Sequence, residues 1–503
     1  MKILLANSPC RIKLKSNQER YFVRAGSRWP FSVVKKRNQR LSYLPFPFFL
    51  AYTAALLEKE GLAVEAWDGV ALNQTEEEFL ESLKKIKPNV ILLETATATI
   101  NHDYQMVRKI KKQLKEVIVC LTGPQVTVFP RQTFKDCPEV DLVIQGEYEV
   151  AFRDYCLALK KGQSFDRIAG LVFKKNRRLV VNPPRLTEDI NVLPYPARHL
   201  FPNREISDPT VYWDGFCQFK PAIQMLATRG CPFRCNFCLW NQVIYQNGPY
   251  RMFKAKRVVD EMIFCQKKYG AKEIYFDDDT FTANKKNVLA ICREIRKRRL
   301  KIHWSVMGDA MVTDQEMIEA MSQAGCVGIK FGVESGDRKI LRSIQKPIDF
   351  AKLEKFTDWC AKRRLKTHAT FTFGLSGETQ TTMEKTLKLA ERLDVDSVQF
   401  SITTPFPGTR YYQELKKKRR LKVKSWEDFD GACQSVVKFE NLSRREVVAY
   451  CRAATGRWLL TKLRQPHWLL RQFFYLRRLI KGQGLTVIWK LSKKMVTLLT
   501  ARS

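Results

Sequence analysis

The chain has 503 residues, more than one hydrophobic core usually organises, so two or three domains are expected. A hydrophobic fraction of 45% with 31 phenylalanines indicates a folded globular protein and not a disordered one. The formal net charge of +37 predicts an anionic partner or surface. Nucleic acid, anionic lipid and a phosphorylated small substrate all meet that requirement.

The cysteines and the first residues indicate the compartment. Fourteen cysteines are sparse for a disulfide scaffold of this length, and MKILLANSPC predicts a buried strand and not a signal peptide. No uninterrupted apolar stretch is long enough to span a membrane. We therefore expect a protein of the reducing cytoplasm, where clustered thiols more often bind metal, and any membrane contact is expected to be peripheral.

Residues 1–165 alternate between apolar runs that predict strands and patterns typical of helices. KILLAN, NVILLET and VIVCLTG are examples of the runs. The alternation predicts βαβ units around a parallel sheet, that is, an α/β, Rossmann-like, doubly wound domain. Residues 166–220 are rich in proline and basic residues and predict a linker that contains one hairpin.

Residues 221–420 contain a second alternating series. Its strand candidates include AIQMLAT, EIYFDDD, CVGIKFGVESG and THATFTFGLSG, each followed by a helical segment. This series predicts a partial (β/α)6 barrel whose chemistry lies at the carboxyl ends of the strands. Residues 421–503 predict a helical basic region, which has no Asp or Glu from residue 447 onward.

The motif RGCPFRCNFCLW follows the first strand of the barrel series. It places Cys231, Cys235 and Cys238 in C-x3-C-x2-C spacing on one tight loop. Three thiolates can ligate three irons of a [4Fe-4S] cluster and leave the fourth iron open to a substrate or cofactor. The alternative is a zinc knuckle, but zinc usually needs four ligands in paired C-x2-C form and no second pair lies nearby.

From Ala222 to about Thr409 the sequence resembles the radical S-adenosylmethionine superfamily. The hallmark of that superfamily is such a loop with an aromatic residue, here Phe237, before the last cysteine. The resemblance implies that the open iron chelates the methionine moiety of S-adenosylmethionine and that Phe237 lies near the adenine. It also implies that a donor such as flavodoxin or ferredoxin reduces the cluster, so that a 5′-deoxyadenosyl radical is formed.

Further segments match the superfamily in order. FDDDTFT places Asp278 and Asp279 where the family contacts the methionine ammonium. GIKFGVESGD places Glu334 and Ser335 where the family contacts the ribose and methionine ends, and Gly374 in FTFGLSGET suits a backbone that passes close to a ligand. The alternatives are that an aspartate caps the following helix, that Glu334 pairs with a barrel cation and that the glycine serves an ordinary turn.

Polar residues also follow the expected strands of residues 1–165. No G-x-G-x-x-G follows the first strand, so a dinucleotide is disfavoured. A Rossmann-like domain with GPQVT and GEYE segments before a radical barrel resembles the cobalamin-binding domain of class B radical enzymes. The residues that this resemblance assigns to cobalamin are Thr95, Thr97, Gly123, Gln125, Thr127, Gly146 and Glu147.

One motif of some cobalamin proteins is absent. The D-x-H-x-x-G segment that supplies a histidine to cobalt does not occur. A bound cobalamin would then have a lower cobalt face that is bare, water-bound or met by another residue. His102 is the only histidine of residues 1–165, and we expect it at a helix start or on the surface.

The resemblance as a whole favours cobalamin-dependent methylation of an unactivated carbon, with a ring-forming or rearranging radical reaction as the alternative. A methylthiotransferase acting on tRNA would resemble the chain only in the barrel. A non-catalytic iron-sulfur protein that binds nucleic acid would have no need of the acidic and glycine-containing strand ends, so nucleic acid is not a favoured partner.

The basic aromatic tail leaves two interpretations open. Helical spacing of Trp468, Leu469, Phe473 and Leu476, with arginines at other positions, favours an interfacial helix on anionic lipid. That interpretation predicts peripheral contact with the inner face of the membrane and a lipid-like substrate. In the other interpretation the aromatic residues pack on the barrel and the cations form a solvated face. A small-molecule substrate is compatible with both.

Overall fold

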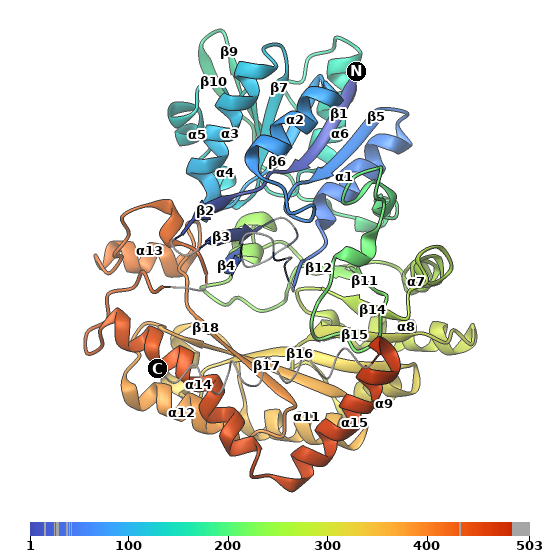
Figure 1. Cartoon of the computed structure of the whole chain (residues 1–503), viewed down its shortest axis with the longest axis vertical. Helices are drawn as coiled ribbons and strands as arrows, with labels where there is room; N and C mark the ends of the chain where they lie inside the picture. The colour runs from blue at the N-terminus through green and yellow to red at the C-terminus, as the bar shows by residue number, and fades with distance from the viewer. Residues whose placement is uncertain are drawn as a thin grey trace.

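The computed structural model contains two α/β units, one above the other in Figure 1, with a proline-rich connector between them. Within the described residues, no helix is long and apolar enough to cross a membrane. The end of the predicted basic tail, residues 485–503, lies outside the description. The residues described are 1–14, 17–24, 26, 30–36, 39, 41, 43–431 and 434–484.

The amino-terminal unit is built on a sheet with the strand order β10-β9-β8-β7-β6-β1-β5. Neighbouring strands from β8 to β5 are parallel, as predicted, and their order places the topological switch point between β1 and β6. The strands are β1 (Lys2–Asn7), β5 (Ala63–Asp68), β6 (Val90–Glu94), β7 (Ile118–Thr122), β8 (Leu142–Ile144), β9 (Leu171–Lys175) and β10 (Arg178–Val181).

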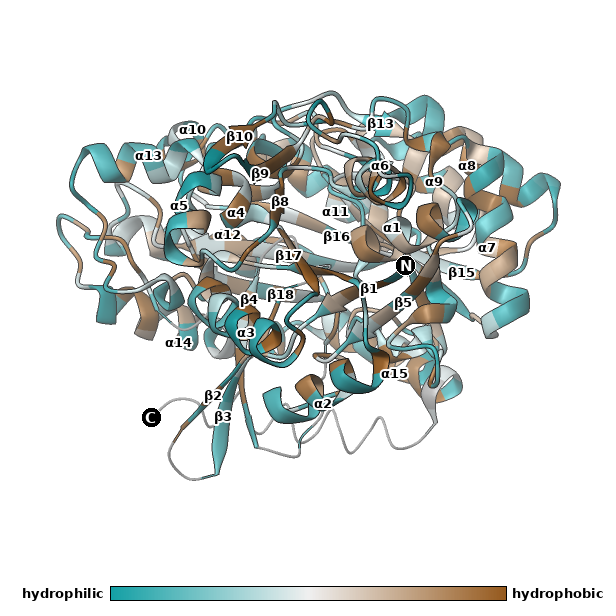
Figure 2. Ribbon diagram, turned by 90° about the horizontal axis from the view of Figure 1, so that it is seen from above, coloured by the Kyte–Doolittle hydropathy of each residue, from teal (hydrophilic) through white to brown (hydrophobic). Residues whose placement is uncertain are grey.

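Helices cover both faces of this sheet, which explains the continuous apolar runs of its strands. Ile3 and Leu5 of β1 pack with one layer of helices, and Leu4 and Ala6 pack with the other layer. One layer consists of α1 (Phe48–Lys59) and α6 (Glu149–Lys160). The other consists of α2 (Glu76–Ile86), α3 (Ile100–Gln113), α4 (Pro124–Val128) and α5 (Pro130–Asp136). Figure 2 shows hydrophobic colour on these strands and hydrophilic colour on much of the outer helices.

The predicted hairpin of the linker forms, but it belongs to the first sheet. β9 pairs antiparallel with β8 and with β10, so the sheet continues to Val181. The predicted boundary at residue 165 therefore falls inside the sheet. The pairing along β8 decides this point, and local sequence does not reveal which strand a hairpin will join.

A small three-stranded antiparallel sheet, which the sequence analysis did not predict, separates β1 from α1. Its strands are β2 (Arg11–Lys13), β3 (Gln18–Val23) and β4 (Phe31–Lys36), and it lies between the two units in Figure 1. Arg24, just after β3, is buried and pairs with Asp103 of α3 at 2.6 Å. On the other side, Ser32 N donates to Asp430 O (3.1 Å), so this sheet contacts both units.

The second unit is an incomplete parallel barrel with the strand order β11-β14-β15-β16-β17-β18. Sheet neighbours are also neighbours in the chain, which confirms the predicted partial (β/α)6 barrel. Its strands are β11 (Ala222–Met225), β14 (Glu273–Phe276), β15 (His303–Gly308), β16 (Cys326–Glu334), β17 (Lys366–Phe373) and β18 (Ser397–Ile402). Its helices are α7 (Ala255–Tyr269), α8 (Lys285–Lys297), α9 (Gln315–Gln323), α10 (Arg338–Ser343), α11 (Phe350–Lys362) and α12 (Gln380–Arg392).

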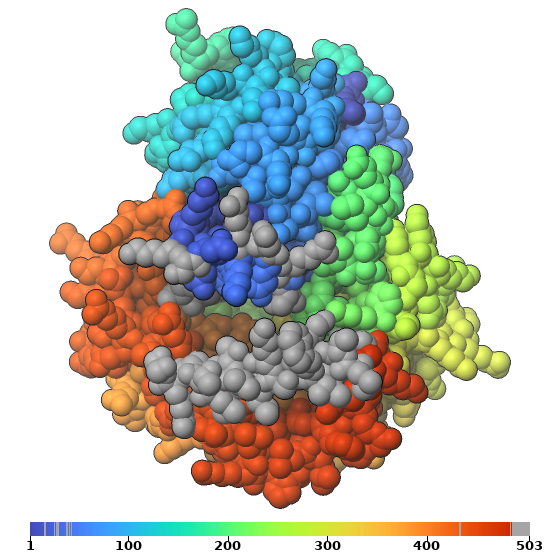
Figure 3. Space-filling view, viewed as in Figure 1, coloured from blue at the N-terminus to red at the C-terminus, as the bar shows by residue number. Residues whose placement is uncertain are grey.

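The carboxyl-terminal region is helical, as predicted, and wraps the barrel (Figures 1 and 3). After α13 (Arg410–Lys417), α14 (Arg444–Lys462) packs beside α12 and β18, and Trp458 Nε1 donates to Ala390 O (3.1 Å). α15 (Pro466–Gln483) crosses the amino ends of the strands, where Trp468 Nε1 donates to Val395 O (3.1 Å). These two tryptophans thus pack on the barrel.

Candidate functional site

The three cysteines of the motif lie on the loop that follows β12 (Thr228–Arg229), which pairs with β13 (Arg251–Met252). Burial raises the pKa of the thiols of Cys235 and Cys238 to about 12 and also raises the pKa of Cys231. Cys231 also raises the pKa of Cys235, and both of these thiols raise the pKa of Cys238. Iron cations would offset the unfavourable ionisation of thiols in such a setting.

The arrangement of the thiols fits a cluster better than a single ion. Among the described residues, no three His, Cys, Asp or Glu side chains converge closely enough to hold one metal ion. In a [4Fe-4S] cluster each thiolate binds a different iron, so the sulfur atoms do not need to converge on one point. Three separate thiols on one loop are therefore compatible with the cluster.

The loop of the three cysteines, residues 230–239 (the cluster loop), is held by hydrogen bonds to the end of α10 and to the turn that follows it. Asn236 N donates to Ile344 O (3.1 Å), and Asn236 Nδ2 donates to Ser343 O (3.0 Å). Gln242 Nε2 donates to Cys238 O (2.9 Å) from the π-helical turn Trp240–Ile244 that follows the loop. These contacts fix the loop backbone, while the Cys231 thiol lies 3.1 Å from Thr280 Oγ1.

A buried cation stands beside the cysteines. Lys346 Nζ donates to Asp309 Oδ2 (2.5 Å) at the end of β15. Burial lowers the pKa of Lys346, but Asp309, Cys235 and Glu334 together raise it above its ordinary value. The lysine is therefore a positive charge available to a cluster held by thiolates or to the carboxylate of a ligand. The sequence analysis missed both Lys346 and Asp309.

The two predicted aspartates bind the backbone of the segment that leads into the cluster loop. Asp278 Oδ1 accepts from Ala227 N (3.0 Å) and Thr228 Oγ1 (2.5 Å), and burial raises the pKa of Asp278 to about 7. Asp279 Oδ2 accepts from Gly230 N (3.1 Å). Neither aspartate caps the next helix, because Asn284 is the N-cap of α8. The helix-cap alternative is therefore wrong.

Glu334 and Ser335 are adjacent in sequence but face different surroundings. Glu334 ends β16 with a φ of 72°, at a shift in the register with β17, and its Oε2 accepts from Thr372 Oγ1 (2.8 Å). A left-handed conformation is uncommon for glutamate and is often found at functional sites. Ser335 is buried with its hydroxyl 3.3 Å from Thr386 Oγ1 on α12. Only Glu334 shares the charged environment of Lys346.

Phe237 and Gly374, the two other residues predicted to contact S-adenosylmethionine, have mainly apolar neighbours. Phe237 is half-buried against the apolar residues of α10, including Ile340 and Leu341. Gly374 has a φ of 86°, and its N–H donates to the carboxylate of Glu378. The space around Gly374 is filled by residues of the carboxyl-terminal region, such as Phe439. The predicted contacts of Phe237 and Gly374 with S-adenosylmethionine stay predictions.

In the amino-terminal unit, several residues that were predicted to contact cobalamin form hydrogen bonds between the strand ends. Thr95 N and Thr95 Oγ1 both donate to Thr122 O (2.8 Å). Gly123 packs so tightly that a Cβ atom there would lie 2.1 Å from Thr95 O. Thr127 Oγ1 donates to Gly123 O (2.8 Å) and accepts from Gly146 N (3.1 Å). Thr97 is buried in a helical turn at the same edge.

Gln125, one of the residues predicted to contact cobalamin, has a side-chain oxygen without a hydrogen-bond partner in the described chain. Gln125 is buried at the end of β7, and its Oε1 has no hydrogen-bond partner within the described chain. Gln145 Oε1, at the end of β8, is in the same condition. Buried polar atoms nearly always have a partner in the functional state, so these two oxygens are compatible with a polar ligand at this edge, as cobalamin would be.

Glu147 has a different role from the one predicted for it. Its Oε1 accepts from Arg229 (3.1 Å), and its Oε2 accepts from Arg251 (2.6 Å) and from Thr187 N (2.7 Å). Glu149 accepts from Arg229 at 2.5 Å. Both oxygens of Glu147 are thus used by the chain itself, and the prediction that it contacts cobalamin gains no support.

The ion pairs of Arg229 join the two units at the cluster loop. Arg229 is fully buried and lies two residues before Cys231, while Glu147 and Glu149 follow the carboxyl end of β8. A Cβ atom on Gly146 would lie 2.8 Å from Gln246 Nε2 and 3.3 Å from the backbone oxygen of Ile244, so the two units also approach closely here. The carboxyl ends of the two sheets therefore meet. The sequence analysis assigned no role to Arg229, although it is the first residue of the quoted motif.

Comparisons with known proteins agree with the division of the chain into an amino-terminal α/β unit and a barrel. Residues 39–155 match the family model of the B12 binding domain, and residues 225–390 match that of the radical SAM superfamily. An uncharacterised methyltransferase of Pyrococcus horikoshii is 31% identical over 443 residues, which cover 87% of this chain and 93% of that protein. The chain belongs to the cobalamin-binding radical S-adenosylmethionine enzyme family. Its cofactors are a [4Fe-4S] cluster, S-adenosylmethionine and cobalamin.

More distant relatives share the fold. An anaerobic magnesium-protoporphyrin IX monomethyl ester cyclase of Rubrivivax gelatinosus is 24% identical over 392 residues, which cover 74% of this chain and 66% of that protein. The structure of TsrM from Kitasatospora setae, with cobalamin and a [4Fe-4S] cluster bound, has 17% identity and a TM-score of 0.67, and covers 95% of this chain and 99% of that chain. OxsB with aqua-cobalamin and S-adenosylmethionine bound has 16% identity and a TM-score of 0.64, and covers 91% of this chain and 66% of that chain.

Proposed function

We propose that this enzyme uses cobalamin to methylate an unactivated carbon of a small-molecule substrate. The observation that carries the proposal is the meeting of the two sheets at Arg229, beside the cluster loop. When bound, the cluster and S-adenosylmethionine supply a hydrogen-abstracting radical and cobalamin supplies the methyl group. The close relative named a methyltransferase supports the choice of reaction.

The residues of the chain have distinct parts in this proposal. Cys231, Cys235 and Cys238 hold the cluster, and Lys346 offsets negative charge beside it. Asp279 orients the loop through Gly230 N. The residues proposed to line the S-adenosylmethionine site are Phe237, Asp278, Asp279, Glu334 and Gly374.

Cobalamin is proposed to lie on the polar edge formed by the ends of β6, β7 and β8. Gln125 Oε1 and Gln145 Oε1 are free to accept from its amide groups. Thr95, Thr97, Gly123 and Thr127 would shape that edge through the hydrogen bonds between the strand ends. The apolar core behind them keeps bulk water from the reaction space.

A ring-forming reaction is the second candidate. The relatives named cyclases match across most of this chain, although each is longer than the matched region. Both candidates need the same cluster ligands, so the outcome depends on whether a methyl group is consumed.

The test uses the full chain, reconstituted anaerobically with iron, sulfide and hydroxocobalamin. Reaction with S-adenosylmethionine and a low-potential reductant is followed by quantifying 5′-deoxyadenosine and S-adenosylhomocysteine. We expect both products from the wild type and neither 5′-deoxyadenosine nor cluster absorbance from the triple Cys231→Ala, Cys235→Ala, Cys238→Ala variant. 5′-Deoxyadenosine without S-adenosylhomocysteine, in the presence of bound cobalamin, would contradict methylation and favour ring formation.

We also propose peripheral contact with the inner face of a membrane through α15. Its outward side chains are large and apolar, with exposed fractions of 43% for Leu469, 64% for Leu470, 57% for Phe473 and 47% for Phe474. Arginine and lysine side chains surround them, and no acid follows residue 446. An apolar strip bordered by cations is typical of helices that bind anionic lipid.

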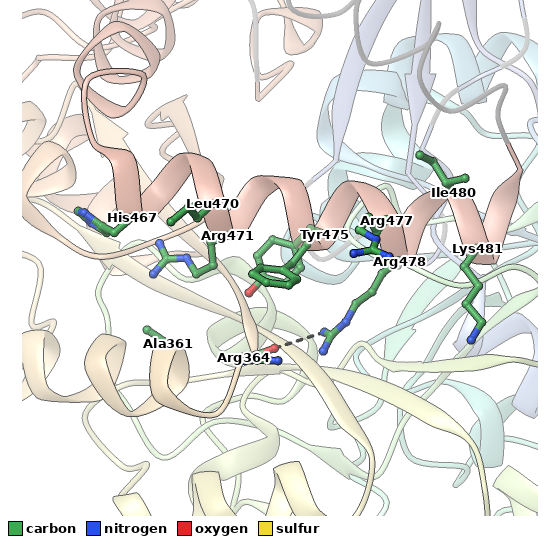
Figure 4. Close-up of a pocket in the computed structure, with 11 residues that line it drawn as sticks. Ala361, Arg364, His467, Leu470, Arg471, Tyr475, Arg477, Arg478, Ile480 and Lys481 are labelled. Carbon is green, nitrogen blue, oxygen red and sulfur yellow. Dashed lines mark hydrogen bonds between the residues drawn. The ribbon is translucent and has the colours of Figure 1, made fainter.

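The opposite side of α15 attaches it to the barrel. Arg471 pairs with Asp394 (2.6 Å) and Asp396 (2.7 Å), and Tyr475 and Arg478 also point toward the sheet (Figure 4). An open groove of about 760 Å³ lies between α15 and the barrel residues Ala361 and Arg364, and Leu470 and Phe474 of the apolar strip also line it. α15 lies at the amino ends of the strands, whereas the cluster loop lies at the carboxyl ends. Contact through α15 would therefore anchor the enzyme, and it lends no support to a lipid-like substrate.

Vesicle flotation tests the anchor. The variant Leu470→Ser, Phe473→Ser, Phe474→Ser is expected to lose binding to phosphatidylglycerol vesicles. The matched control is Val192→Ser with Ile206→Ser, which replaces apolar side chains that are each 52% exposed on the connector. Equal flotation of the wild type and the α15 variant would contradict membrane contact.

A further inference from the structure

The groove between α15 and the barrel is held in shape at both ends of the helix. Near the amino end, Arg471 forms ion pairs with Asp394 and Asp396. At the carboxyl end, Gly482 packs so closely that a Cβ atom there would lie 2.8 Å from Gln218 O of the connector. The groove is therefore preformed, and a ligand that enters it would need to order little of the chain.

The half of the groove toward the carboxyl end of α15 is positively charged. It is lined by Arg364, Arg477, Arg478 and Lys481, and none of these side chains forms an ion pair with an acidic residue that the structure describes. Arg478 and Lys481 point from α15 toward the barrel (Figure 4), and Arg478 Nη1 donates to Arg364 O (3.3 Å). Like charges gathered on one surface repel one another, so an anion bound among them would be stabilised.

His303, the first residue of β15, senses the same positive charge. Burial lowers the pKa of His303, and Arg478 and Lys481 lower it further. The imidazole is therefore mainly neutral at pH 7, where arginine and lysine stay protonated. The charge of the groove at neutral pH thus comes from its arginines and its lysine.

Apolar side chains lie beside these cations. Leu470 and Phe474 of the apolar strip line the groove, as does Ile480. The guanidinium carbon of Arg364 lies 5.4 Å from the ring centroid of Phe474, so positive charge adjoins the strip directly. A ligand along the groove would meet apolar surface and positive charge together, which suits an anionic amphiphile.

Arg364 is the cation that a simple interfacial helix does not explain. It follows α11, and its φ of 53° is a left-handed conformation that is more usual for glycine or asparagine after a helix. The cations of α15 lie in the last turns of that helix, where the helix dipole favours positive charge. Arg364 therefore separates a built site from a helix that only presents cations to a surface.

We propose that this half of the groove binds the phosphate of one anionic phospholipid, whose acyl chains follow the apolar strip into the bilayer. The inference rests on the proposed membrane contact of α15 and adds a headgroup site to it. Phosphate oxygens accept charge-assisted hydrogen bonds from guanidinium and ammonium groups, which are their usual protein partners. Nucleic acid would also satisfy the cations, but it has no chain to cover the apolar strip.

The experiment measures binding of short-chain lipids to the full chain by isothermal titration calorimetry, below the critical micelle concentration. The probes are dihexanoyl phosphatidylglycerol, dihexanoyl phosphatidylcholine, which has the same chains but no net charge, and glycerol 1-phosphate, which has no chains. The test variant is Arg364→Ala. The matched control is Lys362→Ala, which removes an exposed cation from the same end of α11 but outside the groove. Arg364→Gly, which suits the left-handed backbone, repeats the test if Arg364→Ala does not fold.

Wild type and Lys362→Ala are expected to bind one phosphatidylglycerol molecule per chain, and more tightly than either other probe. Arg364→Ala should bind it at least about tenfold more weakly, because a charge-assisted hydrogen bond is lost. An unchanged affinity in the Arg364 variants, or an equal loss in Lys362→Ala, would overturn the proposal. Binding of phosphatidylcholine or of glycerol 1-phosphate as tight as that of phosphatidylglycerol would also overturn it, because the site would then select neither the charge nor the lipid.

Vesicle flotation separates a failure of the headgroup site from a failure of the anchor. If the wild type floats with phosphatidylglycerol vesicles but binds no short-chain phosphatidylglycerol, the headgroup site is wrong and the anchor stands. If the wild type does not float, the membrane contact on which the site rests is wrong as well.

Discussion

The carboxyl ends of the two parallel sheets use their polar residues in different ways. At the barrel, Asp278 and Asp279 accept hydrogen bonds from the backbone that leads into the loop of the three cysteines, and Glu334 accepts one from Thr372. At the amino-terminal sheet, Thr95 and Glu147 are occupied by hydrogen bonds within the chain.

The proposed function gives a reason for this difference. A cluster would be bound by covalent ligands, and the three cysteines proposed to bind it share one short loop. A large organic cofactor is held by the shape of an edge, to which glycines and strand-to-strand hydrogen bonds contribute without touching it.

The largest expected effect is the loss of cluster iron from the barrel, without any loss of cobalamin from the amino-terminal unit. Cys235→Ala removes one of three ligands, so we expect nearly complete loss of cluster iron with cobalamin binding retained. Iron, sulfide and cobalamin are quantified after reconstitution. Cys265→Ala is the control, because Cys265 is buried in α7 outside the loop and should keep its iron. Iron retention by Cys235→Ala would refute the ligand assignment.

The next largest effect concerns the buried ion pairs of Arg229, which connect the barrel to the amino-terminal unit. Arg229→Met leaves Glu147 and Glu149 buried without their shared cation, and breaking a buried ion pair in this way costs about 3–5 kcal/mol. Urea denaturation should show this loss together with reduced cobalamin retention. The control Arg198→Met breaks the buried pair with Glu261 (2.8 Å), which does not involve the amino-terminal sheet. It should lose stability but retain cobalamin.

A pH dependence is expected from the amino-terminal sheet. Burial raises the pKa of Glu94, at the end of β6, from 4.5 to about 7, although the Tyr148 hydroxyl donates to it (2.6 Å) and lowers it. The folded state thus keeps a proton that the unfolded state has lost, so stability falls as pH rises from about 4.5 to 7. The loss is roughly 3 kcal/mol in total. Glu94→Gln should remove this pH dependence of stability. If stability falls with pH equally in the wild type and in Glu94→Gln, the dependence does not come from Glu94.

The smallest effect compares one glycine from each region. Gly123 (φ 112°, ψ 178°) lies in a region that is almost exclusive to glycine, and Gly374 (φ 86°) also has a positive φ; such conformations cost other residues about 1–3 kcal/mol. At Gly123 a Cβ atom would also meet Thr95 O at 2.1 Å, whereas at Gly374 the nearest atom is 3.4 Å away. Thermal unfolding should therefore show a greater loss for Gly123→Ala than for Gly374→Ala. Equal losses would mean that the edge around Thr95 can relax.

Much of the barrel site follows from local sequence. The cysteine loop, the strand-end acids and the alternating pattern were all predictable, and Asp309 could have been added because it follows a predicted strand. Lys346 could not, since it lies beyond α10 and reaches the site only through the path of that helix. The small sheet of β2, β3 and β4 was also missed, because its short strands carry many charged residues.

The sequence by itself determined the two α/β units, the cluster loop and the family, because periodic burial and closely spaced ligands are local properties of a chain. Only the tertiary structure decided that β9 and β10 extend the first sheet, that Glu147 serves an ion pair and that Trp468 packs on the barrel while Phe473 stays exposed. Each of these outcomes depends on which distant segment provides a partner. The energy of such pairing is set by burial and contact in three dimensions, which the order of residues does not specify locally.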